Sequence, residues 1–179
     1  SDDTDEAVRM ATDVIDGFAD RYDTAWTTQA RRKLGLDEAE TADARRLAVG
    51  FIELLRAHRA DLTRSSRATA DLDRLLAEFG SGADEEVRTW HRGLTREVRR
   101  LGIDEREWID RVAARNPIVI PRNHLVEAAL TAAVERDDLS RWERLLDAVR
   151  DPYSEPADDA LTRPAPTDFT TEYRTFCGT

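Results

Sequence analysis

Cysteine, lysine, glycine and proline are all scarce in this chain of 179 residues. Its one cysteine, Cys177, excludes an internal disulfide framework and fits a reducing compartment. Lys33 is the only lysine among 27 basic side chains, so 26 of them are arginines. Four of the six prolines follow residue 150, which leaves the sequence before that point almost free of helix breakers.

Long hydrophobic runs are also missing, and so is an excess of positive charge. No stretch approaches the roughly 20 apolar residues that cross a bilayer, and residues 1–6 are acidic where a signal peptide is basic. The net charge of −10 repels a phosphate backbone. We therefore expect neither a membrane nor a nucleic acid as a partner.

Motifs of catalysis and metal binding are absent from the sequence as well. Gly80 and Gly82 begin a pattern like a glycine-rich phosphate loop, but Glu85 occupies the place of the third glycine. The three histidines lack the spacing of a metal site, and one cysteine cannot complete a zinc centre. His58, at the end of an expected helix, is interpreted as a half-buried core or cap residue. We expect no catalytic residue, no metal ligand and no cofactor in this chain.

The pattern that is present predicts an all-α fold of about seven amphipathic helices. Residues 1–150 are expected to form one helical unit, and residues 151–179 an irregular, proline-containing tail. The first helix is expected to continue to Gly35, a left-handed stop, and others to begin near Thr41 and Asp104. Residues 63–76 are expected to form one helix, residues 116–121 a buried extended connector, and the four tryptophans part of the core. The apolar face of the first helix consists of Val8, Ala11, Ile15, Phe18, Tyr22 and Trp26.

The second half of the chain carries a set of short motifs in a recognisable order. Asn116-Pro117 is followed by Arg122-Asn123-His124, by Pro152-Tyr153 and by Phe176-Cys177-Gly178-Thr179. Upstream lie Lys33-Leu34-Gly35-Leu36 and Asp61-Leu62-Thr63. This ordered set resembles the C-terminal portion of the selenoprotein O family. The chain departs from the family at Leu62, which replaces a tyrosine, at Ser65-Ser66-Arg67, and at Pro121.

The resemblance implies that the chain is the C-terminal part of a kinase-like protein adenylyltransferase. Members of the family transfer AMP from ATP to Ser, Thr or Tyr hydroxyls of proteins with a divalent metal, Mg²⁺ or Mn²⁺. Their nucleotide- and metal-binding residues precede the matching segment. The chain would therefore extend the helical lobe, with the N-terminal catalytic part of the same protein as its partner and protein substrates as partners of the whole. A cytoplasmic location is the default for a bacterial protein, since eukaryotic relatives are mitochondrial.

The resemblance also assigns roles to particular residues. Cys177 stands where relatives have selenocysteine or cysteine, a residue implicated in redox control, and the implied role is a reversible disulfide with a cysteine outside this chain. Structural roles are implied for six motif residues: Asn116, Pro117, Arg122, Asn123, Pro152 and Tyr153.

Two other interpretations stay open at this stage. The chain could be an independent helical scaffold or protein-interaction module, since its helices are amphipathic and no chemistry is visible. It could also be a stand-alone relative that has lost its catalytic half. A fragment of a larger lobe should expose apolar surface, whereas an independent monomer should not.

Overall fold

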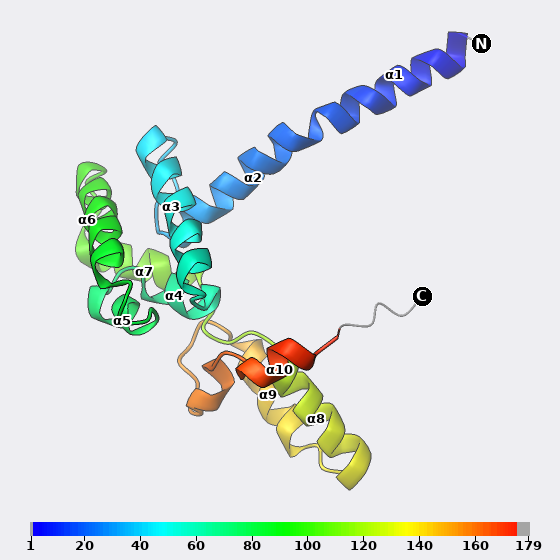
Figure 1. Cartoon of the computed structure of the whole chain (residues 1–179), viewed down its shortest axis with the longest axis vertical. Coiled ribbons are helices and arrows are strands. Elements are labelled where there is room, and N and C mark those ends of the chain that lie inside the picture. Colours follow the sequence, from blue (N-terminus) through cyan, green and yellow to red (C-terminus); the bar gives the residue numbers. More distant parts are fainter. Residues whose placement is uncertain (1, 175–179) are drawn as a thin grey trace.

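The computed structural model describes residues 2–174, which form ten α-helices and one short 3₁₀ helix (Figure 1). The all-α prediction is confirmed. In chain order the elements are α1 (Asp2–Asp16), α2 (Phe18–Lys33), α3 (Ala42–His58), α4 (Leu62–Ala68), α5 (Leu72–Ala77), α6 (Asp84–Arg100), α7 (Glu105–Arg115), α8 (Asn123–Arg136), α9 (Ser140–Arg150), η1 (Asp159–Thr162) and α10 (Thr167–Glu172).

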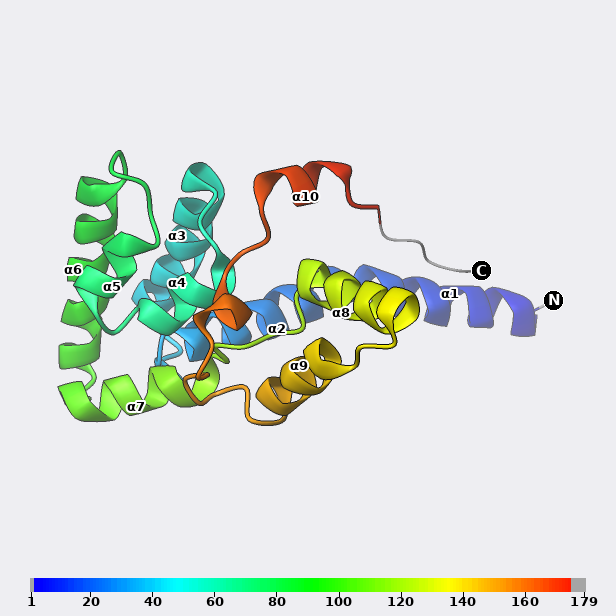
Figure 2. The same ribbon diagram turned by 90° about the horizontal axis from the view of Figure 1, so that it is seen from below.

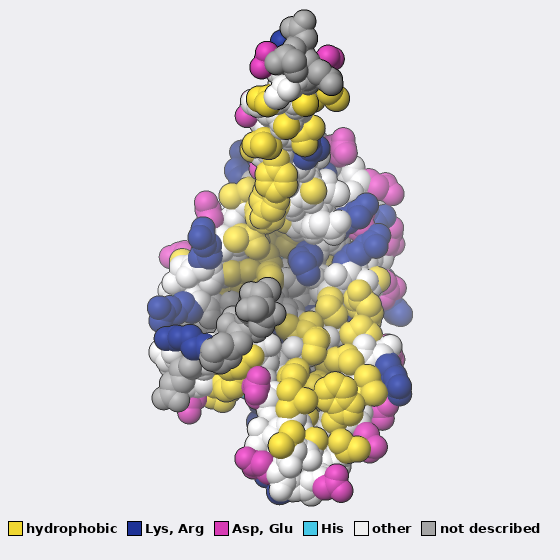
Figure 3. Space-filling view, turned by 90° about the vertical axis from the view of Figure 1, so that its right-hand side faces the viewer, with side chains coloured by type: hydrophobic (Ala, Val, Ile, Leu, Met, Phe, Trp, Pro, Cys, Tyr) yellow, Lys and Arg dark blue, Asp and Glu magenta, His cyan; other side chains and the backbone are white. Residues whose placement is uncertain are grey.

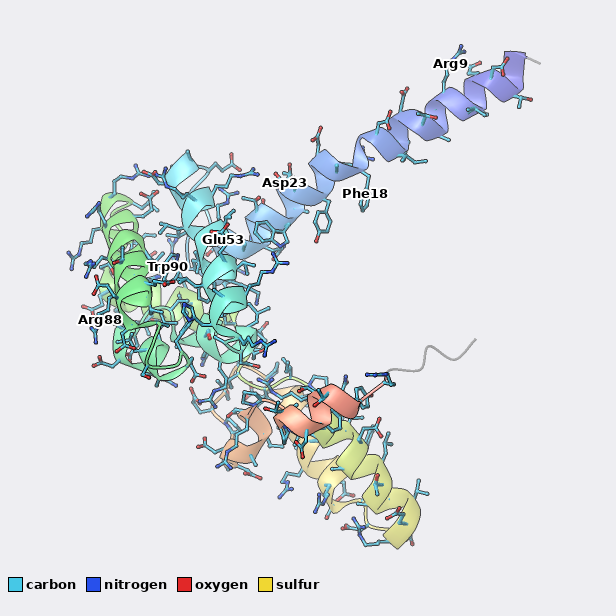
Figure 4. The ribbon with its side chains drawn as sticks, in the orientation of Figure 1. Arg9, Phe18, Asp23, Glu53, Arg88 and Trp90 are labelled. Carbon is cyan, nitrogen blue, oxygen red and sulfur yellow. The ribbon has the colours of Figure 1, made fainter. Side chains whose placement is uncertain are left out.

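Helices α2 to α7 surround the main hydrophobic core, and Figure 2 shows α3 to α7 grouped at one end of the molecule. Leu34, Leu75 and Leu94 are fully buried there. Phe51 of α3 stacks on Trp90 of α6 with ring centroids 4.9 Å apart, and the Trp90 indole N–H donates to the Leu47 carbonyl (2.9 Å). Figure 4 shows Trp90 between the two helices. These contacts fix the α2–α7 group, called the body below.

The predicted helix ends near Thr41 and Asp104 are confirmed by their hydrogen bonds. The Thr41 hydroxyl accepts from the Ala44 N–H (3.0 Å), and the Asp104 carboxylate accepts from the Glu107 N–H (2.9 Å). Each bond satisfies a backbone donor that the first helical turn leaves without an internal partner. Gly35 has φ +72°, as expected for a left-handed helix stop.

Two expected helices are interrupted in the structure. The first is divided at Gly17, whose φ and ψ of −74° and −5° keep α1 and α2 nearly in line as one rod (Figure 1). The second, over residues 63–76, is split because the Asp71 carboxylate accepts from the N–H groups of Asp73 and Arg74 (both 3.1 Å) and starts α5 anew. The tail also contains local order, since η1 and α10 lie within it.

Tryptophan burial differs from the expectation. Trp108 is buried, 4% exposed, and its indole N–H donates to the Leu34 carbonyl (2.9 Å). Trp26 and Trp90 are half-buried, but Trp142 of α9 is 43% exposed. Placing all four in the core was therefore wrong for Trp142, because the apolar side of α9 is only partly covered by α8. His58 is half-buried against Phe79, as interpreted (centroids 6.0 Å apart).

Helices α8 and α9 form a second arm beyond the body (Figure 1). They pack mainly against each other, with Ala129, Ala132 and Leu145 buried. The connector before α8 is extended and buried at Ile118 and Val119, as predicted. Across residues 2–174, no helix combines the length and the apolar character that crossing a bilayer requires.

Gly35 offers a direct test of the turn that ends α2. A Cβ at this position would lie 2.8 Å from Trp108 Cδ1, and the positive φ is itself unfavourable for alanine. We expect Gly35→Ala to lower the free energy of unfolding by about 2–4 kcal/mol in chemical denaturation followed by circular dichroism. Gly82→Ala, where a Cβ meets no atom within 4 Å, is the control and should stay within about 1 kcal/mol of the parent. Equal effects of the two changes would contradict this account.

Candidate functional site

The motif residues converge on the place where the second arm meets the body. The Asn116 side chain is buried, and its Nδ2 donates to the carbonyls of Lys33 (2.7 Å) and Val112 (2.9 Å). Lys33 Nζ donates to Asn116 Oδ1 (3.4 Å), and burial lowers the pKa of Lys33. Asn116 therefore ties the end of α7 to the end of α2.

Arg122, just before α8, forms a two-pronged ion pair with Asp61, just before α4. Its Nη1 and Nη2 lie 2.7 and 2.9 Å from the two carboxylate oxygens, and the two side chains are only 10% and 17% exposed. Asp61 also caps α4 by accepting from the Arg64 N–H (2.9 Å). Arg122 donates further to the Thr162 carbonyl of η1 (3.2 Å). One arginine thus joins three segments.

The protonation of Asp61 is set by competing effects. Burial alone would raise its pKa, but hydrogen bonds from Arg122 and from the Arg64 backbone, with the charges of both arginines, hold the pKa below its ordinary value. Asp61 is therefore a carboxylate in the folded protein at neutral pH.

Two more arginines from α4 complete this region. Arg64 pairs with both carboxylate oxygens of Glu78 (2.7 and 2.8 Å), which raises the pKa of Arg64. Arg67 donates to the carbonyls of Ala113, of Asn116 (3.1 Å) and of Tyr153 (2.9 Å). We call Asp61, Arg64, Arg67, Glu78, Asn116 and Arg122 the polar junction.

The other predicted motif residues contribute to the junction unevenly. Pro152 and Tyr153 act through their backbone carbonyls, since the Pro152 oxygen accepts from the N–H groups of Ile118 (2.8 Å) and Val119 (3.2 Å). Pro117 is half-buried in the connector, and Asn123 is exposed at the first turn of α8. Cys177 lies outside the described residues.

The sequence interpretation missed Arg64, Arg67 and Glu78. Arg67 was noted only within a segment that departs from the family, and Arg64 and Glu78 lie in no motif. Their partners lie up to 86 residues away, so no local pattern identifies the contacts. Asp61 was noticed only as part of a motif, although an aspartate directly before an expected helix is a capping signal.

The charged side chains of the junction are occupied by one another and by backbone carbonyls. Asp61 and Glu78 are each paired with an arginine, and Arg67 is anchored on carbonyl oxygens. Among the described residues, no three His, Cys, Asp or Glu side chains gather as a metal site would require. The arrangement holds the second arm in a defined direction relative to the body.

A first apolar surface lies on α1 and the start of α2. Its six large side chains are 59–70% exposed: Val8, Met10, Val14, Ile15, Phe18 and Tyr22. Val8, Ile15, Phe18 and Tyr22 follow one another at steps of seven, three and four residues and so share one helical face. Figure 4 shows Phe18 on one side of the rod, with Arg9 and Asp23 on the other. We call this the α1–α2 stripe.

A second apolar surface covers the outer side of α8 and α9. Leu130, Val134, Leu139 and Trp142 are 43–85% exposed there. Figure 3 shows this patch on the same face of the molecule as the α1–α2 stripe. The α1–α2 rod and the second arm therefore direct apolar surface toward one side, and the described residues leave both surfaces exposed.

Known proteins share the sequence of this segment. The family model for protein adenylyltransferase SelO matches residues 6–150, which run from α1 to the end of α9. The chain belongs to the SelO family. The residues of the polar junction and of both apolar surfaces all lie within the matched residues 6–150. They therefore belong to one segment of the family.

Individual relatives agree with the family match. A protein nucleotidyltransferase YdiU of Chromobacterium violaceum is 41% identical over 189 aligned residues, which cover 99% of this chain and 38% of the relative. Proteins of the same description from Geobacillus kaustophilus and Cereibacter sphaeroides are 35% and 43% identical and are matched over 36% and 35% of their length. This SelO-family chain thus spans little more than a third of these relatives.

The Asp61–Arg122 pair can be tested through stability. Asp61→Asn leaves a nearly buried arginine without its counter-charge, so we expect a loss of about 2–3 kcal/mol in the free energy of unfolding at pH 7. Asp43→Asn removes one partner of an exposed pair with Arg46 and should cost less than about 1 kcal/mol.

The same variant predicts a pH dependence. Because the pKa of Asp61 is lowered by folding, its contribution is complete above the unfolded value of about 4 and is lost as the pH falls through the folded value. The stability difference between the parent and Asp61→Asn should be constant from about pH 5 to 8 and shrink below about pH 4. A difference that grows on acidification would refute this assignment.

Proposed function

We propose that this chain is the bracing segment of a longer protein adenylyltransferase, which transfers AMP from ATP to Ser, Thr or Tyr hydroxyls of proteins. The support is the family match, the relatives described as protein nucleotidyltransferases, and the partial coverage of those relatives. The catalytic part, with ATP and Mg²⁺ or Mn²⁺, would lie in the remaining two-thirds, in the cytoplasm. In that reaction a protein hydroxyl attacks the α-phosphorus of ATP, pyrophosphate leaves, and the hydroxyl proton is released.

The observation that carries the bracing role is the α1–α2 stripe. It has the amphipathic pattern of a helix that packs on one side, yet its six large apolar side chains are exposed. Full burial of one such side chain contributes about 1.5–3 kcal/mol, so covering six that are 59–70% exposed would contribute on the order of 10 kcal/mol. A helical rod with this much uncovered apolar surface is expected in a segment that packs on more protein.

The acidity of α1 restricts what could cover the stripe. Residues 2–16 contain six acidic side chains and one basic side chain, Arg9. An amphipathic helix that lies on an anionic membrane has a basic polar face. The apolar face and the acidic polar face together favour a protein surface as the partner.

Phosphoryl and nucleotidyl transfer depends on accurate placement of reacting groups, so a rigid brace contributes to rate without contacting them. On this proposal the helices extend the kinase-like lobe and hold it through the stripe. The alternative of a stand-alone scaffold has less support, because an independent monomer should cover such surface. A chain that has lost its catalytic half would differ by having no adenylyltransferase sequence upstream in its gene.

The proposal predicts that stripe residues matter only in the longer protein. Ile15→Asp and Tyr22→Asp place a charge on the stripe, and Thr24→Asp places one on the exposed polar side of α2. In the 179-residue chain the free energy of unfolding of all three variants should lie within about 1 kcal/mol of the parent's value, because these positions are exposed. In the full-length protein the two stripe variants should lose several kcal/mol and at least tenfold in AMP transfer, measured with labelled ATP.

Thr24→Asp should retain full activity in the full-length protein. If Ile15→Asp and Tyr22→Asp behave like Thr24→Asp there, the stripe is not covered and the bracing role is lost. Transfer of AMP by the 179-residue chain alone would show that the catalytic apparatus lies within it.

Cys177 carries a separate prediction from the family resemblance, on which the described residues give no structural information. We expect the full-length protein to form a reversible disulfide through this thiol, because an accessible thiolate is the species that oxidises. Full-length protein and its Cys177→Ser variant should then differ in electrophoretic mobility and AMP transfer under oxidant but agree under reductant. Identical behaviour in all four cases would exclude the redox role.

A further inference from the structure

Within the apolar surface of the second arm lies a notch of about 150 Å³. It is lined by Pro121, Val126, Trp142, Leu145, Leu146 and Val149, with almost no polar surface. Leu145 is 5% exposed, whereas Trp142 is 43% exposed. The notch is therefore an open apolar depression and not a closed part of the core.

The size and chemistry of the notch define what fits it. A depression of about 150 Å³ lined by aliphatic and aromatic side chains has room for a benzene-sized group. A phenylalanine ring or a leucine or methionine side chain has that size, and a charged group would lose its hydration without gaining a partner. The occupant is a single large apolar side chain.

The position of the notch indicates which molecule supplies that side chain. Helices α8 and α9 pack mainly against each other, and Arg122 and Arg67 link this part of the chain to the body by polar contacts. The apolar patch around the notch faces the same side as the α1–α2 stripe (Figure 3). A single body placed against that side would cover both surfaces.

We infer that the notch receives a large apolar side chain from the catalytic part of the same polypeptide, so that the chain grips that part at two separate points. This inference rests on the proposed function and adds a second, independent contact to it. About two-thirds of the length of the SelO-family relatives lies outside the matched segment. That length is ample for one domain to meet both arms.

Thiol labelling measures the coverage of each point separately. Val126→Cys lies in the notch, Thr131→Cys lies at an exposed polar position of the same helix, and Ile15→Cys lies on the stripe. Each variant is treated with N-ethylmaleimide as the full-length protein and as the 179-residue chain, and peptide mass spectrometry gives the rate at each cysteine. Peptide resolution keeps Cys177 and any other thiol out of the measurement.

We expect Val126→Cys to react at least tenfold more slowly in the full-length protein than in the 179-residue chain. Thr131→Cys should change less than twofold. Equal rates for Val126→Cys in both forms, with Ile15→Cys protected, would overturn the notch contact and leave the bracing role standing. If Val126→Cys and Ile15→Cys each react equally fast in the full-length protein and in the 179-residue chain, both the notch contact and the bracing role are contradicted. Protection of Val126→Cys in the 179-residue chain that rises with its concentration would assign the notch to a second copy and also overturn the inference.

Filling the notch provides the second measurement. Val126→Trp places its ring in the open depression and excludes another side chain, whereas Thr131→Trp does not. We expect Val126→Trp to lower the Tm of the full-length protein by several degrees relative to Thr131→Trp and to leave the Tm of the 179-residue chain within about 2 °C. A loss of the same size in both forms would show that Val126 acts only within the arm, and the labelling rates would then decide on the contact.

Discussion

The direction of the second arm depends on the ion pair between Arg122 and Asp61. Asp61 caps α4 and accepts two hydrogen bonds from Arg122, which also reaches the Thr162 carbonyl. Such bonds need both distance and angle, so they define one orientation where apolar packing would permit several. Arg67 adds three carbonyl contacts from the same helix. The junction therefore works as a directional link between two groups of helices, and it leaves their apolar outer faces available.

Much of the fold was predictable from the sequence because its signals are local. The cap at Thr41, the cap at Asp104 and the left-handed stop at Gly35 each depend on residues within one helical turn. The break at Asp71 had a local signal as well, because the aspartate carboxylate accepts a hydrogen bond from the N–H two residues later. The prediction did not use this signal. The division at Gly17 has no signal in the apolar spacing, since the apolar face continues across it.

Burial and the polar junction were beyond a single sequence for a different reason. Periodicity shows which side of a helix is apolar, but it does not show whether another element covers that side. Trp142 and the α1–α2 stripe illustrate this, because both follow a core pattern and both are exposed. The pairing of Arg64 with Glu78 and the contact of Arg67 with Tyr153 depend on how distant segments meet. Of the junction residues, Asn116 and Arg122 were assigned structural roles in advance and Asp61 was noted within a motif, and all three came from the resemblance.

The junction within the chain is polar, whereas the exposed surfaces are apolar, and this difference has a mechanical consequence. Apolar burial is strong but has no preferred direction, so a docking surface positions its partner only if the surface itself is rigid. Here one apolar face lies on the α1–α2 rod and the other on the second arm, and hydrogen-bonded arginines link the second arm to the body. A partner that fits both faces at once must adopt one position, whereas a partner held by either face alone could slide or rotate. On the proposed function, in which the longer protein aligns ATP with a protein hydroxyl, a brace with two fixed points restricts the motions that would disturb that alignment.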